Sequence, residues 1–127
     1  MRELIFVDVE TTGLDPKQDQ LVELAYARRI DATPKTLYFG VQSVPTFVDD
    51  LIGFTKRGLA GKESTTHEFD DFFRVAEGAT MVAANPAFDK AFLVEADLFR
   101  FHHRMLDIET YAMAKLDLDE MPGMADI

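Results

Sequence analysis

The chain has 127 residues, the length of one domain and too short for two separate hydrophobic cores. Its composition, 47% hydrophobic and 28% charged with no cysteine, excludes wholesale disorder, disulfides and cysteine-based metal sites, and the cytoplasm is the expected compartment. No apolar stretch approaches the roughly 18 residues that a membrane helix needs. The net charge of −10 argues against an extended groove binder of nucleic acid, which would be basic. An acidic protein can still act on nucleic acid if it holds few nucleotides and recruits divalent cations.

Three strands are predicted in the first third of the chain. Residues 3–9, 21–30 and 36–41 are rich in branched and aromatic side chains. Residues 11–16, Thr-Thr-Gly-Leu-Asp-Pro, are a turn cluster between the first two strands. Short connections of this kind predict an antiparallel meander.

Helical periodicity dominates the middle of the chain. A first helix is predicted from apolar residues on one face, including Val48 and Leu59, and ends at Gly58 or Gly61. A second helix follows a capping box, in which Thr65 precedes Glu68 by three residues. Its phenylalanine and alanine residues recur at i, i+3, i+4 and i+7 over residues 69–76. Two consecutive helices are therefore predicted between the meander and the next strand.

The last part of the chain alternates strands and helices. A strand is predicted over residues 80–84, and Asn85-Pro86 opens a helix whose apolar stripe extends to Phe99. Residues 104–108 form a fifth strand, and a helix follows over 109–115. The order β-β-β-α-α-β-α-β-α predicts an α/β fold, a mixed sheet covered by helices, with residues 1–127 as a single domain.

Two acids at the end of the first strand require an explanation. Asp8 and Glu10 are two residues apart, so the alternation of a strand places both side chains on one face. Half-buried like charges are costly unless a positive charge neutralises them. Mg²⁺ and Mn²⁺ prefer oxygen ligands and would do so. The alternative is a pair of solvated acids at a strand end.

Residues 6–14, Phe-Val-Asp-Val-Glu-Thr-Thr-Gly-Leu, resemble the first motif of the DnaQ-like 3′–5′ exonucleases of the DEDD superfamily. That family includes polymerase proofreading subunits, ribonuclease T and oligoribonuclease. It is named for four metal-binding acids in three motifs. Asn85, Phe88 and Asp89 resemble the second motif in residue type, spacing and place. A helix start presents such residues together, and the helix dipole favours Asp89 in the first turn.

The third motif of the family, His-x-Ala-x-x-Asp or Tyr-x-x-x-Asp on the last helix, has no match. Tyr111 is followed four residues later by Lys115. His102 and Asp107 have the spacing of the histidine form, but we interpret them as a coincidence within a strand because Arg104 replaces the small residue. We expect either a truncated chain, with its C-terminal helices absent, or a member without the last motif.

The resemblance implies a ribonuclease H-like fold with a five-stranded sheet of order 3-2-1-4-5. The first three strands would be antiparallel, and the fourth and fifth parallel to the first. It also implies two divalent cations, Mg²⁺ or Mn²⁺, with Asp8 bridging both and with Glu10 and Asp89 as further ligands. The implied substrate-binding residues, which grip the terminal nucleotide and orient the scissile bond, are Thr11, Thr12, Gly13, Leu14, Asn85 and Phe88. Gly13 is expected to allow the backbone to approach the nucleotide closely.

The predicted function is hydrolysis of the 3′-terminal phosphodiester of single-stranded DNA, in proofreading, replication or repair. A DNA polymerase is a candidate partner, and no membrane is expected. One alternative is an RNA-trimming enzyme similar to oligoribonuclease. Oligoribonuclease has Met-Thr-Gly at this place, however, and the Thr-Thr-Gly of residues 11–13 is somewhat more similar to the proofreading members. Another is a catalytically silent nuclease-fold module that binds a polymerase, a replication partner or a nucleic-acid end. The missing motif predicts weak activity or none for this chain alone.

Overall fold

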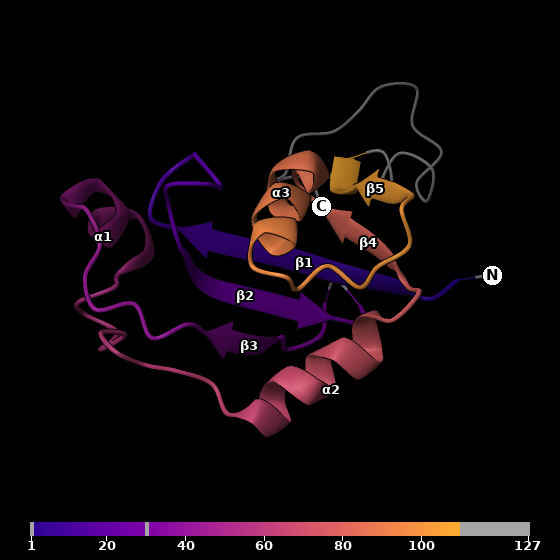
Figure 1. Ribbon diagram of the computed structural model, residues 1–127, viewed down its shortest axis with the longest axis horizontal. Helices are drawn as coiled ribbons and strands as arrows, with labels where there is room; N and C mark the ends of the chain where they lie inside the picture. Colours follow the sequence, from indigo (N-terminus) through magenta and orange to yellow (C-terminus); the bar gives the residue numbers. More distant parts are fainter. Residues whose placement is uncertain (1, 30, 110–127) are drawn as a thin grey trace.

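The computed structural model describes residues 2–29 and 31–109. In chain order, the elements of this part are β1 (Leu4–Thr11), β2 (Leu21–Ala27), β3 (Lys35–Tyr38), α1 (Thr46–Ile52), α2 (Thr66–Ala76), β4 (Thr80–Ala83), α3 (Pro86–Glu95) and β5 (Met105–Asp107). The strands form one sheet of order β3-β2-β1-β4-β5 (Figure 1). β1, β2 and β3 are antiparallel neighbours, whereas β4 and β5 run parallel to β1. The α/β class, the sheet order and the strand directions predicted from the sequence are confirmed.

The main core lies on one face of the sheet. Ile5, Val7 and Val9 alternate along β1 and are buried against side chains of α2 and α3, among them Phe72 and Phe92. In Figure 1, α3 lies across β1 and β4, while α2 runs along the side of the sheet that carries β3. The same alternation sends Phe6, Asp8 and Glu10 to the other side of β1. The core face of β1 thereby fixes which side of the strand carries the acids.

The capping box holds the start of α2 as predicted. The Thr65 hydroxyl accepts the Glu68 N–H at 3.1 Å, and the Glu68 carboxylate accepts the Thr65 N–H at 2.9 Å. The helix buries Phe72 completely, and its ring meets Tyr26 of β2 edge-to-face at 5.1 Å. Local sequence signals and tertiary packing agree at this helix. None of the helices in the described part of the chain is long and apolar enough to cross a membrane.

The first helix is shorter than predicted. α1 ends at Ile52, because Gly53 adopts a left-handed φ of 70° and the Asp49 carboxylate accepts both the N–H and the hydroxyl of Thr55. Residues 53–61 form turns, and Leu59 joins a second, smaller apolar cluster that includes Val22 of β2. A side-chain contact across six residues therefore replaces the expected helical continuation.

Several other boundaries also differ from the prediction. β2 ends at Ala27 and β3 at Tyr38, after which Gly40 donates its N–H to Lys62 and the chain leaves the sheet. α3 ends at Glu95, so Phe99 lies outside the helix, beyond Asp97, which has a φ of 58°. The predicted C-terminal helix begins at Ile108 and Glu109, and its remainder lies outside the described residues.

Candidate active site

The strand register brings the acids of β1 close to the start of α3. Leu4, Ile5 and Phe6 pair with Thr80–Val82 of β4, so β1 continues past the end of β4 by the residues that include Asp8 and Glu10. α3 begins directly after β4, and its first turn contains Asp89. Acids from β1 and α3 therefore meet at the edge where the parallel strands end, a common location of ligand sites in α/β proteins.

Asp89 is the most strongly perturbed acid in the described part of the chain. The residue is 5% exposed, and its carboxylate accepts a hydrogen bond from the N–H of Val9. Burial raises the pKa of Asp89 to about 7, and repulsion from Asp8 and, less strongly, Glu10 adds to this effect. The Val9 N–H holds the carboxylate in place, although it compensates only part of the unfavourable burial and repulsion.

The two acids of β1 are also disfavoured as anions. Burial raises the pKa of Asp8, and the charge of Glu23 raises it further. The pKa of Glu10 is raised by burial, by Asp8 and by Glu23. Glu23 stands directly opposite Glu10 in the antiparallel register of β1 and β2. Four carboxylates consequently repel one another across β1, β2 and α3.

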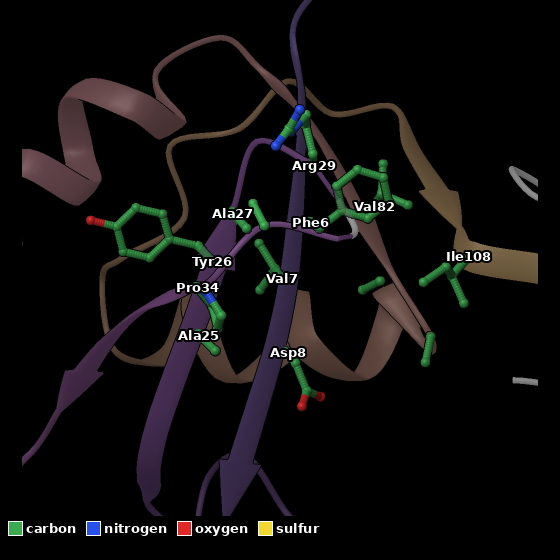
Figure 2. A pocket seen from close by; sticks show the side chains of 13 residues that line it. Phe6, Val7, Asp8, Ala25, Tyr26, Ala27, Arg29, Pro34, Val82 and Ile108 are labelled. Carbon is green, nitrogen blue, oxygen red and sulfur yellow. The ribbon is translucent and has the colours of Figure 1, made fainter. Parts of the chain in front are cut away.

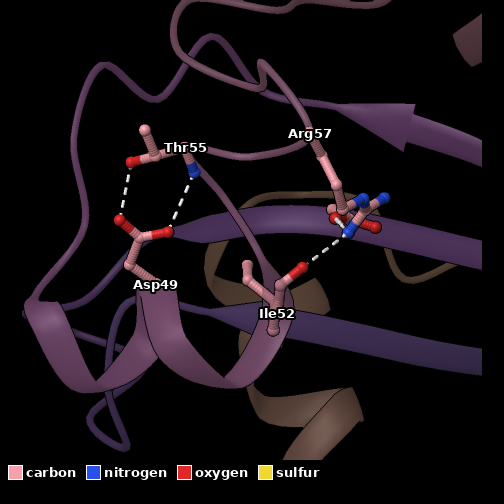
Figure 3. A network of polar contacts seen from close by, with 5 residues as sticks. Asp49, Ile52, Thr55 and Arg57 are labelled. Carbon is pink, nitrogen blue, oxygen red and sulfur yellow. Dashed lines mark hydrogen bonds and ion pairs between the residues drawn. The ribbon is translucent and has the colours of Figure 1, made fainter.

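A single arginine offsets part of this charge. Arg57, in the turns after α1, places Nη1 2.5 Å from Glu23 Oε1 and donates to the carbonyl oxygen of Ile52 at 3.2 Å (Figure 3). The Arg57 charge lowers the pKa of Glu10, against the three causes that raise it. We did not predict this pair from the sequence. A glutamate within the apolar run 21–25 is the signal that could have revealed Glu23, because a buried acid needs a partner.

The donor set fits a divalent cation by its chemistry. Asp8, Glu10 and Asp89 offer only carboxylate oxygens, the ligands that Mg²⁺ and Mn²⁺ prefer, and a cation would relieve the repulsion described above. Within residues 2–29 and 31–109, no three acidic, histidine or cysteine side chains are arranged closely enough to hold a metal ion as they stand. Like charges lower their repulsion by turning apart, so binding requires the carboxylates to turn toward a common point.

An apolar pocket of about 310 Å³ lies beside Asp8, on the face of β1 that also carries Phe6 (Figure 2). Its lining includes Ala25 and Ala27 of β2, Val82 of β4 and Ile108 after β5. In Figure 2 the Asp8 side chain extends away from the cluster of apolar side chains. The carboxylate is therefore free to point toward the strand ends, where Glu10 and Asp89 lie.

The predicted substrate-binding residues lie on two segments that flank the acids. Thr11, Thr12, Gly13 and Leu14 follow β1, and Leu14 is 84% exposed. Asn85 occupies the N-cap position of α3, and its carbonyl oxygen accepts the N–H groups of Phe88 and Asp89. The expected side-chain cap by Asn85 is not formed, and the residue is exposed. Its side chain is thus exposed at the start of the helix turn that contains Asp89.

The remaining candidate residues are placed differently. His102 donates its N–H to the carbonyl oxygen of Ala79, and its pKa is lowered by loss of hydration and by the Arg2 charge. His102 therefore lies next to the start of β4. Asp8 lies toward the other end of the strands, where β4 ends. Asp107 pairs with Ala83 at the carboxyl end of β5, on the same edge as Asp8 but with β4 in between. Tyr111 and Lys115 lie outside the described residues.

Comparison with known proteins agrees with this architecture. A family model described as Exonuclease, RNase_T, matches residues 5–126. The chain is 33% identical to DNA polymerase III subunit epsilon of Treponema pallidum (strain Nichols), over 85% of this chain and 53% of that protein. It is 28% identical to the 3′-5′ exonuclease DinG of Bacillus subtilis (strain 168), over 94% of this chain and 13% of that protein. The chain thus spans about half of the first relative and a small part of the second.

The fold is also similar to solved structures of exonuclease I. The apo enzyme superimposes with a TM-score of 0.60 at 16% identity, over 97% of this chain and 33% of that chain. The structure described as the ExoI/SSB-Ct complex gives a TM-score of 0.61 at 15% identity, with similar coverage of 97% and 32%. At such identities the similarity shows a shared fold.

Proposed function

Because the chain belongs to the DnaQ-like 3′–5′ exonuclease family, we propose that it hydrolyses the 3′-terminal phosphodiester of single-stranded DNA with divalent cations held by Asp8, Glu10 and Asp89. We also propose that residues 1–127 belong to one exonuclease domain. The observation that carries the proposal is the environment of Asp89. Its side chain is buried, its pKa is raised to about 7, and both acids of β1 repel it. A fold maintains such a set of acids at a cost, and a bound cation offsets that cost.

Divalent cations at this site would activate a water molecule and neutralise charge on the scissile phosphate. The residues of the chain position these groups. Asp8 and Glu10 are fixed on one face of β1 by its pairing with β2, and Asp89 is fixed by the Val9 N–H. Asp8, which repels both of the other acids, would supply carboxylate oxygens to hold the cations.

The flanking segments would hold the substrate end. Two apolar surfaces are available to a terminal base: the exposed side chain of Leu14 and the ring of Phe88, whose centroid lies 5.0 Å from that of Phe92. Such contacts do not depend on the identity of the base. Thr11, Thr12 and Gly13 lie next to the acids, and the exposed amide of Asn85 can donate to a phosphate or sugar oxygen. The grip involves few phosphates, which agrees with the net charge of −10.

DNA is favoured over RNA, and a polymerase is the proposed partner. The Thr-Thr-Gly sequence at residues 11–13 resembles the proofreading members somewhat more than oligoribonuclease. The relatives also include a protein named DNA polymerase III subunit epsilon. An RNA-trimming enzyme is the alternative substrate class. A silent binding module is the alternative without catalysis.

Digestion of 5′-labelled single-stranded DNA and RNA of the same sequence tests the proposal. Because the third motif has no match, we expect weak laddering from the 3′ end of the DNA in Mn²⁺. We expect none in EDTA, and a loss of at least about 100-fold in the Asp8→Ala variant. Asp31→Ala, at an exposed position where the carboxylate pairs with exposed Arg29, is the matched control and should retain activity. Equal digestion by Asp8→Ala and the unaltered protein would refute the site. Folded protein that digests neither substrate would favour the silent module.

A further inference from the structure

Residues 12–20 form a tight connection between β1 and β2 that is held by its own hydrogen bonds. The Thr12 N–H donates to the carbonyl oxygen of Gln20 at 2.9 Å, and the Gln20 N–H donates to the Thr12 hydroxyl at 2.9 Å. Across the loop, the Asp19 N–H donates to the carbonyl oxygen of Asp15 at 2.7 Å, and the Asp19 carboxylate accepts the Asp15 N–H at 3.0 Å. The Thr12 hydroxyl lies 3.5 Å from the other oxygen of this carboxylate. The Asp19 carboxylate therefore lies against both Thr12 and Asp15 across the loop.

The same carboxylate occupies the space beside Gly13. A Cβ atom built on Gly13 would lie 2.5 Å from Asp19 Cγ and 2.8 Å from Asp19 Oδ1, distances at which one group must move. Gly13 is not among the glycines with a positive φ, so its backbone conformation does not require glycine. The lack of a side chain at position 13 is thus explained by the Asp19 carboxylate inside the loop.

We propose that Asp19 is a positioning residue, whose carboxylate holds the segment 11–14 in the conformation that grips the terminal nucleotide. This inference rests on the proposed function and deepens it, because it gives Gly13 a different role from the one expected from the sequence. The glycine makes room for the carboxylate, and the carboxylate in turn fixes Thr12 and the chain that presents the exposed Leu14. The negative charge of Asp19 is unfavourable near a polyanionic substrate. Its hydrogen bonds within the loop offset this cost.

A double-mutant cycle separates these roles. Gly13→Ala, Asp19→Ala and the double variant are compared with the unaltered protein in kcat and KM for 3′ digestion of single-stranded DNA, and in the urea midpoint of unfolding. We expect each single variant to raise KM by about tenfold, with a smaller change in kcat, because the loop grips substrate and does not bind the metal. In the Asp19→Ala background, adding Gly13→Ala should raise KM by no more than about threefold, because the clashing group is gone.

The conservative variant and a distant control complete the test. Asp19→Asn keeps an oxygen acceptor for the Asp15 N–H and should stay within about threefold of the unaltered KM. Glu77→Ala, which removes an exposed acid at the C-terminal end of α2, should leave KM unchanged. KM losses from Gly13→Ala that are equal in both Asp19 backgrounds would overturn the positioning role and return Gly13 to direct contact with substrate.

The outcomes also distinguish a failure of the positioning role from a failure of the proposed exonuclease activity. If the unaltered protein digests DNA and the losses are additive, the positioning role alone is overturned. If the unaltered protein does not digest DNA, the function fails and the positioning role fails with it. Should Gly13→Ala not fold, an Asp19→Ala protein that keeps both its urea midpoint and its KM would equally refute the role of Asp19.

Discussion

Replacement of Asp89 by asparagine should stabilise the metal-free protein at neutral and alkaline pH. In the folded protein the pKa of Asp89 is raised from 3.8 to about 7, so the fold favours the protonated form. Stability from this group is therefore fully present below about pH 4 and is lost as the pH rises toward 7. The asparagine side chain of the Asp89→Asn variant is neutral at every pH, so the variant should avoid that loss.

The size of the effect follows from the pKa. Each pKa unit corresponds to about 1.36 kcal/mol, so the full rise corresponds to an upper limit of about 4 kcal/mol above pH 7. Asparagine accepts the hydrogen bond of the Val9 N–H less strongly than a carboxylate does, which costs about 1–2 kcal/mol. We expect a net gain of about 2–3 kcal/mol at pH 8, a large share of the roughly 5–15 kcal/mol of a typical domain.

Urea unfolding in EDTA, followed by circular dichroism from pH 5 to pH 8.5, measures this gain. The difference between variant and unaltered protein should grow by about 2 kcal/mol between pH 5 and pH 7 and then level off. Asp50→Asn, the same chemical change at an exposed position of α1, should stay within about 0.5 kcal/mol of the unaltered protein. A pH-independent difference, or a less stable Asp89→Asn protein at pH 8, would show that Asp89 is not held in a dry, negative environment.

Three further changes test other parts of the structure. Mn²⁺ should raise the unfolding midpoint of the unaltered protein in a concentration-dependent way, but not that of Asp8→Ala, since a cation that binds only the folded state stabilises it; equal shifts would place the ion elsewhere. Arg57→Met should lower the free energy of unfolding by about 2–3 kcal/mol, because it removes the partner of the Glu23 carboxylate, which is only 10% exposed. In a urea titration, adding Glu23→Gln to the Arg57→Met protein should restore most of this loss. Thr65→Ala should cost about 1 kcal/mol by the same measurement, since it removes the cap of α2, and no change would mean that the capping box contributes nothing.

Much of the fold could be predicted because its signals are local. The capping box before α2 and the Asn-Pro start of α3 depend on residues within one turn of the helix, and both helices begin where predicted. The alternation along β1 likewise depends on neighbouring residues alone. The length of α1 could not be predicted, because its end depends on the Asp49 contact with Thr55 and on the packing of Leu59 against another strand. Apolar spacing alone does not distinguish a continued helix from a turn that buries the same side chain.

The sequence by itself determined the kind of chemistry, since Asp8 and Glu10 share one face of a strand by the alternation of the backbone, and the resemblance of two motifs pointed to a nuclease. Only the tertiary structure decided how strongly the acids interact. The register of β1 with β4 and β2 brings Asp89 to the Val9 N–H and Glu23 opposite Glu10, and the turns after α1 place Arg57 against Glu23. Burial and repulsion depend on distances between segments that are far apart in the chain, and such distances exist only once the sheet has formed.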